Sequence, residues 1–314
     1  MIAFEPATKD EAKARIALCG PAGSGKTYTG LALAFSLGKR VVVVDTERGS
    51  ASKYVGVNGW QFDRHNAVRY SPASLVEILG SAAGQSYDVL LLDSWSHYWE
   101  GVDGMLEQVD QRAKSGNSFS GWKEARPDER RMIDALLAFP GHVIVTMRSK
   151  VEYVVEEDDR GKKVPRKVGL KPIQRDGVEF EFDIVGDLDL DNTLTVSKTR
   201  MPALARAVIH EPGVALAEQV REWLEDGVER PTVAEYRDRV LADDHTAASM
   251  LALHRELEGQ LMLGAPTTNA EGEPTTLRDL VMVRGLALRD AEKAAAAAGD
   301  QPSTAGTPTD GGAA

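Results

Sequence analysis

The stretch GPAGSGKT at residues 20–27 spaces glycines, a lysine and a threonine as G-x-x-x-x-G-K-T. Glycine loses more backbone freedom on ordering than any other residue, so its repeated use in a short loop needs a reason. In such a loop the backbone N–H groups turn inward to hold phosphates, a lysine reaches the outer phosphates and a threonine coordinates magnesium. We therefore predict ATP and Mg²⁺ as ligands, with nucleotide contacts from Gly20, Pro21, Ala22, Gly23, Ser24, Gly25, Lys26, Thr27 and Tyr28.

Two carboxylates complete the predicted chemistry. Asp93 follows the apolar run VLLL, as a Walker B aspartate does, and we expect it to bind magnesium together with Thr27. Glu47 follows the run VVVVDT, and it is our candidate for the general base, whereas Asp45 is expected to support the loop. The residue after Asp93 is Ser94, so the acidic residue that many helicases carry there is absent. An alternative for Asp93 is a strand-end cap, and for Glu47 a solvated loop acid.

Thr146 and Arg148 end the apolar segment HVIVTMRSK. Since they follow a strand that points at the same site, we expect them to sense the γ-phosphate, with ordinary strand-end polarity as the alternative.

The pattern of elements predicts how these residues are brought together. Apolar runs near residues 16–19, 41–44, 89–92 and 142–150 indicate buried parallel strands, and helices are expected at 26–37, at 71–83 and from Pro127 onward. After residue 150 we expect two antiparallel hairpins, turning at 159–161 and at 191–192, and then a helix at 215–226. This alternation indicates an α/β fold, a mainly parallel sheet flanked by helices, with the site at the carboxyl ends of its strands.

The rest of the chain indicates its organisation and location. We expect an ATPase core at 1–226, a helical appendage at 227–297 interrupted at 264–276, and a disordered tail at 298–314. No apolar run reaches the roughly 18 residues of a membrane helix, and the N-terminus has no signal-peptide pattern, so we expect a cytoplasmic protein. Cys19, the only cysteine, is expected to be a buried hydrophobe.

These motifs resemble the RecA-like ATPases, in particular short phage RecA-core proteins that are assigned to the AAA family and implicated in single-strand annealing and recombination. The resemblance covers about residues 13–225, from GPAGSGKT and VVVVDTERGS to YDVLLLDS, VIVTMRSK and LTVSKTR. It implies a RecA-like P-loop NTPase core, ATP hydrolysis with Glu47 as base, and location in the host cytoplasm if the protein is phage-encoded. It also implies a homo-oligomer, because LTVSKTR looks like the K-x-R element that related ATPases lend to a neighbour's nucleotide. Lys198 and Arg200 are then catalytic residues.

A basic segment suggests single-stranded DNA as a partner. Residues 160–175 carry seven Lys or Arg and no acid, in a chain of net charge -11. Cations that replace phosphate counterions give salt-dependent DNA binding. The predicted DNA contacts are Arg148, Lys150, Lys162, Lys163, Arg166 and Lys167. The alternative is that these basic side chains only keep an exposed hairpin soluble. Nearby aromatics could stack on bases, but we favour packing for Trp95, Tyr98, Trp99 and Trp122.

Three functions remain open. The first is an ATPase acting on single-stranded DNA in phage-type recombination, annealing or replication, with a single-strand-binding protein or replication proteins as further partners. The second is a nucleotide-switched helicase loader or assembly factor. The third is a small-molecule kinase, which shares the phosphate loop but needs an acceptor pocket and a closing lid.

Overall fold

The structure is a computed structural model that describes residues 12–114, 117–157, 163–225 and 231–299. The described part of the chain forms a nine-stranded sheet with a small two-stranded sheet beside its helices. Within these residues no helix is long and apolar enough to cross a membrane. The predicted turn at 159–161 and most of the predicted tail lie outside the described residues.

The sheet is mainly parallel, as predicted. Its order is β3-β2-β4-β5-β1-β7-β8-β9, and β6 pairs with the outer half of β5. The parallel strands are β1 (Arg15–Gly20), β2 (Val41–Asp45), β3 (Asp63–Asn66), β4 (Val89–Asp93), β5 (His142–Glu157) and β7 (Ile184–Leu188). Because β5 lies between β1 and β4, residues at its centre stand between the phosphate loop and the Walker B strand.

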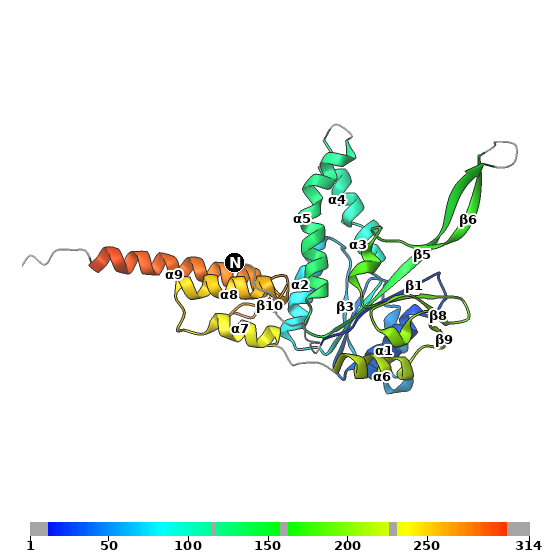
Figure 1. Cartoon of the computed structure of the whole chain (residues 1–314), viewed down its shortest axis with the longest axis horizontal. Helices are drawn as coiled ribbons and strands as arrows, with labels where there is room; N and C mark the ends of the chain where they lie inside the picture. The colour runs from blue at the N-terminus through cyan, green and yellow to red at the C-terminus, as the bar shows by residue number, and fades with distance from the viewer. Residues whose placement is uncertain (1–11, 115–116, 158–162, 226–230, 300–314) are drawn as a thin grey trace, which may run out of the picture.

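Both faces of the sheet are buried, which explains the continuous apolar runs. Successive residues of a strand point to opposite faces. Val42 and Val44 accordingly join one core cluster, and Val41 and Val43 the other. Helices α2 (Pro72–Gly84), α3 (Ser96–Glu100), α4 (Met105–Arg112) and α5 (Ser118–Leu137) cover the first face, and α1 (Lys26–Leu37) and α6 (Val214–Glu225) the second (Figure 1). Cys19 is fully buried in the first cluster, as expected.

Most predicted helices are present with the expected caps. Gly38 ends α1, and Ser71 caps α2 by accepting a hydrogen bond from the Ser74 backbone N–H at 3.2 Å. The prediction that a helix begins at Pro127 is wrong, because α5 begins at Ser118 and contains Pro127 in its interior. The Asn117 side chain caps α5 by accepting from the Phe119 N–H at 3.0 Å, and packing against α2 and α4 holds the helix together although a proline removes one of its hydrogen bonds.

Two hairpins extend the sheet beyond the parallel strands. β5 continues past the sheet and pairs antiparallel with β6 (Lys163–Pro172), so the first predicted hairpin is confirmed and projects away from the core (Figure 1). The second consists of β7 and β8 (Thr193–Thr199) and turns at Asn192, as predicted. A further strand, β9 (Val208–His210), pairs with residues 193–195 of β8 and lies at the edge of the sheet. Short 3₁₀ turns occur at Ala51–Tyr54, Val57–Gly59, Val178–Glu181 and Pro202–Leu204.

The C-terminal part has its own small core. Helices α7 (Val233–Leu241), α8 (Ala247–Gly259) and α9 (Leu277–Gly299) pack around one cluster of buried side chains. The interruption predicted within this part is a β-hairpin of β10 (Pro266–Thr268) and β11 (Pro274–Thr276). This hairpin packs against α2, where a Cβ added to Gly84 would approach the Thr268 side chain within 2.3 Å. Helix α9 includes residues 298 and 299, which were predicted to belong to the tail. The predicted boundary at residue 226 stays a prediction.

Candidate active site

The phosphate loop joins the end of β1 to the start of α1 and needs glycine at particular positions. Gly23 and Gly25 have φ angles of 83° and 84°, the left-handed region that side chains disfavour. A Cβ on Gly20 would lie 2.6 Å from the backbone oxygen of Leu188, and one on Gly25 would lie 2.4 Å from Asn192 Nδ2. These glycines therefore set the curvature of the loop and its close contact with the β7–β8 turn.

Asn192 supports the loop from that turn, and the sequence analysis did not single it out. Its Nδ2 donates hydrogen bonds to the Ser24 backbone oxygen and to Thr29 Oγ1, both at 3.1 Å. The sequence identified this residue only as part of a hairpin turn. Its contact with the phosphate loop depends on β7 lying beside β1, which no local pattern indicates.

The polar groups of the loop suit a nucleotide phosphate. Lys26 Nζ donates to the backbone oxygens of Gly20 and Pro21 at 2.9 and 2.7 Å, so its charge lies over the loop. Burial lowers the pKa of Lys26, and the nearby carboxylates of Asp93 and Glu47 oppose that shift. Ser24 is 1% exposed and its hydroxyl has no hydrogen-bond partner among the described residues, which leaves a buried polar group available inside the loop.

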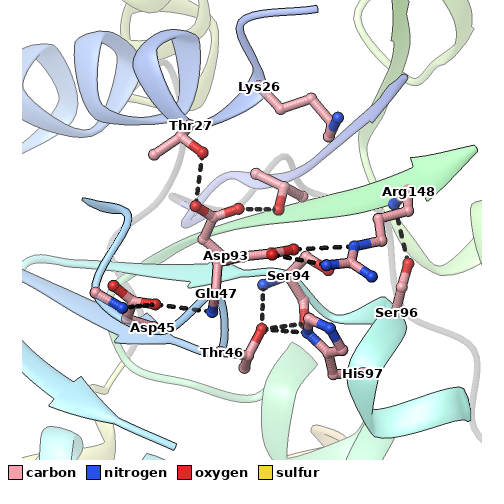
Figure 2. A network of polar contacts seen from close by, with 12 residues as sticks. Lys26, Thr27, Asp45, Thr46, Glu47, Asp93, Ser94, Ser96, His97 and Arg148 are labelled. Carbon is pink, nitrogen blue, oxygen red and sulfur yellow. Dashed lines mark hydrogen bonds and ion pairs between the residues drawn. The ribbon is translucent and has the colours of Figure 1, made fainter. Parts of the chain in front are cut away.

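Asp93 is held by hydroxyl groups from two neighbouring elements. Thr27 Oγ1 donates to its Oδ2 at 2.7 Å (Figure 2). Thr146 Oγ1 donates to its Oδ1 at 2.5 Å. Burial raises the pKa of Asp93, and these two hydrogen bonds act in the opposite direction. A carboxylate and a hydroxyl at one point suit Mg²⁺, which takes few protein oxygens and completes its shell with phosphate and water. Thr146 thus contacts Asp93, and its role as a phosphate sensor stays a prediction.

Glu47 and Arg148 form the second centre of the site. Arg148 Nε donates to Glu47 Oε1 at 3.0 Å, and its terminal nitrogen donates to Oε2 at 2.6 Å, so both oxygens of the candidate base are engaged (Figure 2). This hydrogen bonding raises the pKa of Arg148. The Arg148 backbone N–H donates to Ser96 Oγ at 2.9 Å, which fixes the strand at this point. Arg148 was predicted to contact DNA, but here its guanidinium contacts Glu47.

Asp45 and Thr46 hold the loop that carries Glu47. The carboxylate of Asp45 accepts hydrogen bonds from the backbone N–H groups of Glu47, Gly49 and Ala51 at 2.8 to 3.3 Å, which confirms its structural role. Thr46 Oγ1 accepts from the Ser94 N–H at 2.6 Å and lies 2.6 Å from His97 Nδ1 (Figure 2). Burial lowers the pKa of His97, and the charge of Arg148 lowers it further. The loops after β2 and β4 are therefore tied together beneath Glu47.

Comparison with known families agrees with this site. The sequence model of the AAA domain matches residues 12–207, which include the phosphate loop, Glu47, Asp93 and Arg148. The chain belongs to the AAA domain family. No curated protein matches it. Membership supports nucleotide binding and ATPase activity for this core, which has the α/β fold of P-loop NTPases.

Tyr28 lies at the outer side of the phosphate loop of this AAA domain. It packs against Tyr54 and Trp60, with ring centroids 6.0 and 5.3 Å away, and its hydroxyl accepts from Asn58 Nδ2 at 3.2 Å. A groove of about 810 Å³ lies here, lined by Tyr28, Trp60 and Asn192 among others. The predicted nucleotide contact of Tyr28 is compatible with this position and stays a prediction.

Lys198 and Arg200 lie at the other end of the sheet. Arg200 pairs with Asp183 Oδ1 at 2.8 Å, and Asp183 Oδ2 accepts from the backbone N–H of Arg15, the first residue of β1. Lys198 donates to the Phe182 backbone oxygen. Since β1 separates Arg15 from the phosphate loop by roughly 17 Å, these cations are remote from their own nucleotide site. Residues 193–195 of β8 pair with β9, so this part of the strand does not lie at the edge of the sheet.

The predicted DNA contacts are distributed along the first hairpin. Lys150 is exposed at its base. Lys163, Arg166 and Lys167 stand on β6, where their backbones pair with Glu157, Val154 and Tyr153. Lys162 lies outside the described residues. Trp95 and Tyr98 are buried in the first core cluster, and Trp99 and Trp122 are half-buried and pack against it, with ring centroids 5.7 Å apart, so packing is confirmed for all four aromatics.

Proposed function

We propose that this AAA domain is a RecA-like ATPase that acts on single-stranded DNA in recombination, annealing or replication of the phage type, and that DNA stimulates its ATP hydrolysis. One observation carries the proposal. The strand β5 supplies Thr146 and Arg148 to the nucleotide site and continues without a break into the basic hairpin. A strand that spans both regions supports coupling between DNA and the nucleotide.

The reaction assigns a task to each residue. A water oxygen attacks the γ-phosphorus of ATP, the bond from that phosphorus to the β–γ bridging oxygen breaks, and Glu47 accepts a proton from the water. Lys26 and the loop N–H groups hold the phosphate oxygens. Magnesium held by Thr27 and Asp93 would neutralise charge that develops on the phosphates. Both oxygens of Glu47 are engaged by Arg148 in this structure, so we infer that Arg148 must release Glu47 before hydrolysis.

The test is the rate of phosphate release from ATP–Mg²⁺ by the full chain, with and without a single-stranded oligonucleotide. We expect DNA to increase the rate, and we expect Lys26→Ala to abolish it in a chain that still unfolds cooperatively. Hydrolysis that is indifferent to DNA would overturn stimulation by DNA and favour a loader or assembly factor. ATP consumption that requires a small-molecule phosphate acceptor would indicate a kinase.

We further propose that the active form is a homo-oligomer in which Arg200 meets the nucleotide of a neighbouring subunit. Its distance from its own phosphate loop supports action in trans, and an arginine finger is worth roughly 10³- to 10⁵-fold in rate. Mixing tests this. Lys26→Ala subunits carry intact Arg200, and Arg200→Ala subunits carry an intact phosphate loop, so the mixture should recover activity that neither has alone. A mixture that co-assembles and stays inactive would contradict the proposal.

A further inference from the structure

A second groove lies between α5 and the base of the β5–β6 hairpin. It has a volume of about 900 Å³, within the range of ligand sites. Its wall includes Trp99 and Trp122, Lys150 at the start of the hairpin, and the segment 171–176, which contains the end of β6 and the four residues after it. None of these residues has a task in ATP hydrolysis as described above.

The groove contains polar atoms that the described protein atoms do not satisfy. Gln174 and Glu129 are 8% and 7% exposed, and both Gln174 Nε2 and Glu129 Oε1 have no hydrogen-bond partner among the described residues. Arg175 Nε, which also lacks a hydrogen-bond partner among the described residues, lies 3.8 Å from Glu129 Oε1, close enough for an ion pair but too far for a hydrogen bond. A buried polar atom without a partner costs free energy, so a donor and an acceptor left in one groove point to a ligand that supplies both partners.

Charge and shape define the chemical class of that ligand. Equal numbers of positive and negative side chains line the groove, so its net charge does not favour an anionic ligand. The five cations are Arg126, Arg130, Lys150, Lys171 and Arg175, and the five acids are Glu100, Glu129, Asp134, Asp176 and Glu181. Each of the two half-buried indole rings, tilted by 34° to each other with centroids 5.7 Å apart, has a flat apolar face. A neutral, planar group with adjacent donors and acceptors at its edge fits both features, and an unpaired nucleobase is such a group.

We propose that this groove binds an unpaired nucleobase of single-stranded DNA, which stacks on Trp122 and pairs its polar edge with Gln174 and Glu129. The proposal rests on the proposed function, because it needs DNA on the hairpin. Exposed Arg126, Arg130 and Lys150 then meet the flanking phosphates.

The groove also has a direct connection to the nucleotide site. The Ile173 backbone N–H donates to the Arg148 backbone oxygen at 2.7 Å, and Gln174 follows at once. A base that pairs with Gln174 therefore acts on the segment bonded to Arg148, the residue that engages Glu47. This connection gives DNA a route by which to stimulate hydrolysis.

The experiment compares two probes with the same phosphates, a 20-nucleotide oligo-dT and an abasic strand of equal length. Fluorescence titration of the full chain gives the ratio of the two dissociation constants. Stacking of one base predicts a preference for oligo-dT of roughly 5- to 150-fold. Trp122→Ala and Gln174→Ala should lower this ratio toward one, Trp122→Phe should retain part of it, and Trp223→Phe on α6 should leave it unchanged.

A triple Gln substitution of Lys163, Arg166 and Lys167 separates base recognition from phosphate binding. It should weaken binding of both probes equally, so the ratio of their dissociation constants should not change. The slope of log affinity against log salt concentration should become shallower by up to about 0.7 for each phosphate that is no longer neutralised. A wild-type chain that binds both probes equally overturns the base site and leaves the proposed function standing. A ratio that is insensitive to Trp122 and Gln174 also overturns it. A chain that binds neither probe overturns both proposals.

Discussion

Arg148 and Glu47 are the two residues whose pairing most affects how the site works. A carboxylate whose two oxygens both accept hydrogen bonds from a guanidinium has neither oxygen free to accept a hydrogen bond from the attacking water in the same direction. The pair is partly exposed, with 42% and 26% of the two side chains accessible, which leaves room for Arg148 to change partner. We therefore regard the structure as a resting arrangement of the catalytic base.

Substitution of Arg148 tests that arrangement. Arg148→Ala should raise the rate of ATP hydrolysis in the absence of DNA by roughly tenfold, because it removes the charge-assisted hydrogen bonds that restrain Glu47. The effect is no larger because solvent screens these partly exposed hydrogen bonds. DNA should then stimulate less. Arg148→Lys, which keeps the charge but not the paired geometry, should give an intermediate rate in the same phosphate-release measurement. If Arg148→Ala instead lowers the rate as far as loss of Glu47 does, Arg148 belongs to the catalytic machinery.

The sequence predicted single residues of the site better than their partners. Lys26, Thr27 and Asp93 were recognised because their spacing and the preceding apolar runs are local features, and Thr27 and Asp93 do meet. The contact between Glu47 and Arg148 spans 101 residues and depends on the order of β2, β4 and β5 in the sheet. No local pattern specifies that order, so the pairing was not foreseen.

At the scale of elements, the β7–β8 turn acts as a support for the phosphate loop. Asn192 has a φ of 55°, and its side chain reaches Ser24 and Thr29. Asn192→Gly keeps a residue that accepts this φ but removes both hydrogen bonds, so we expect the ATP dissociation constant to rise about tenfold. Isothermal titration with ATP–Mg²⁺ measures the change.

Asn192→Asp provides the matched control for this contact. It keeps the size of the side chain but directs a carboxylate oxygen at the backbone oxygen of Ser24, so it should weaken ATP binding more than Asn192→Gly does. If Asn192→Asp binds ATP as tightly as the unsubstituted chain, the turn does not support the loop.

Two elements show where local patterns are overridden. Proline is common in the first turn of a helix and rare in its interior, but Pro127 lies in the interior of α5, which a cap and packing contacts stabilise. The Gly-, Pro- and Thr-rich interruption at 264–276 forms the β10–β11 hairpin. This hairpin packs closely against α2 because Gly80 and Gly84 have no side chain at the contact. In both places a long-range contact decides the structure, and the sequence pattern describes only the short-range preference.

At the scale of the whole molecule, His142 makes stability depend on pH. Its Nδ1 accepts a hydrogen bond from the Ala14 N–H at 3.0 Å at the start of the sheet. Burial, with the charges of Lys13 and Arg15, lowers its pKa from 6.5 to about 4. As the pH falls, the unfolded chain protonates this histidine before the folded chain does. The contribution of neutral His142 to the free energy of unfolding is therefore complete above about pH 6.5, and roughly 3 kcal/mol of it is lost as the pH falls toward 4.

Chemical denaturation between pH 4.5 and 7.5 measures this contribution. His142→Asn places an amide oxygen where it can accept from the Ala14 N–H, and it does not titrate in this range, so its unfolding free energy should fall less steeply with acid. Parallel curves for the two proteins would exclude His142 as the source.

The central claim is that this AAA domain hydrolyses ATP with Glu47 as the base, and one measurement tests it most directly. Steady-state phosphate release should fall by about 10²- to 10⁴-fold in Glu47→Gln, which keeps the size of the side chain but accepts no proton, while ATP–Mg²⁺ still binds. Normal turnover in Glu47→Gln would contradict the account.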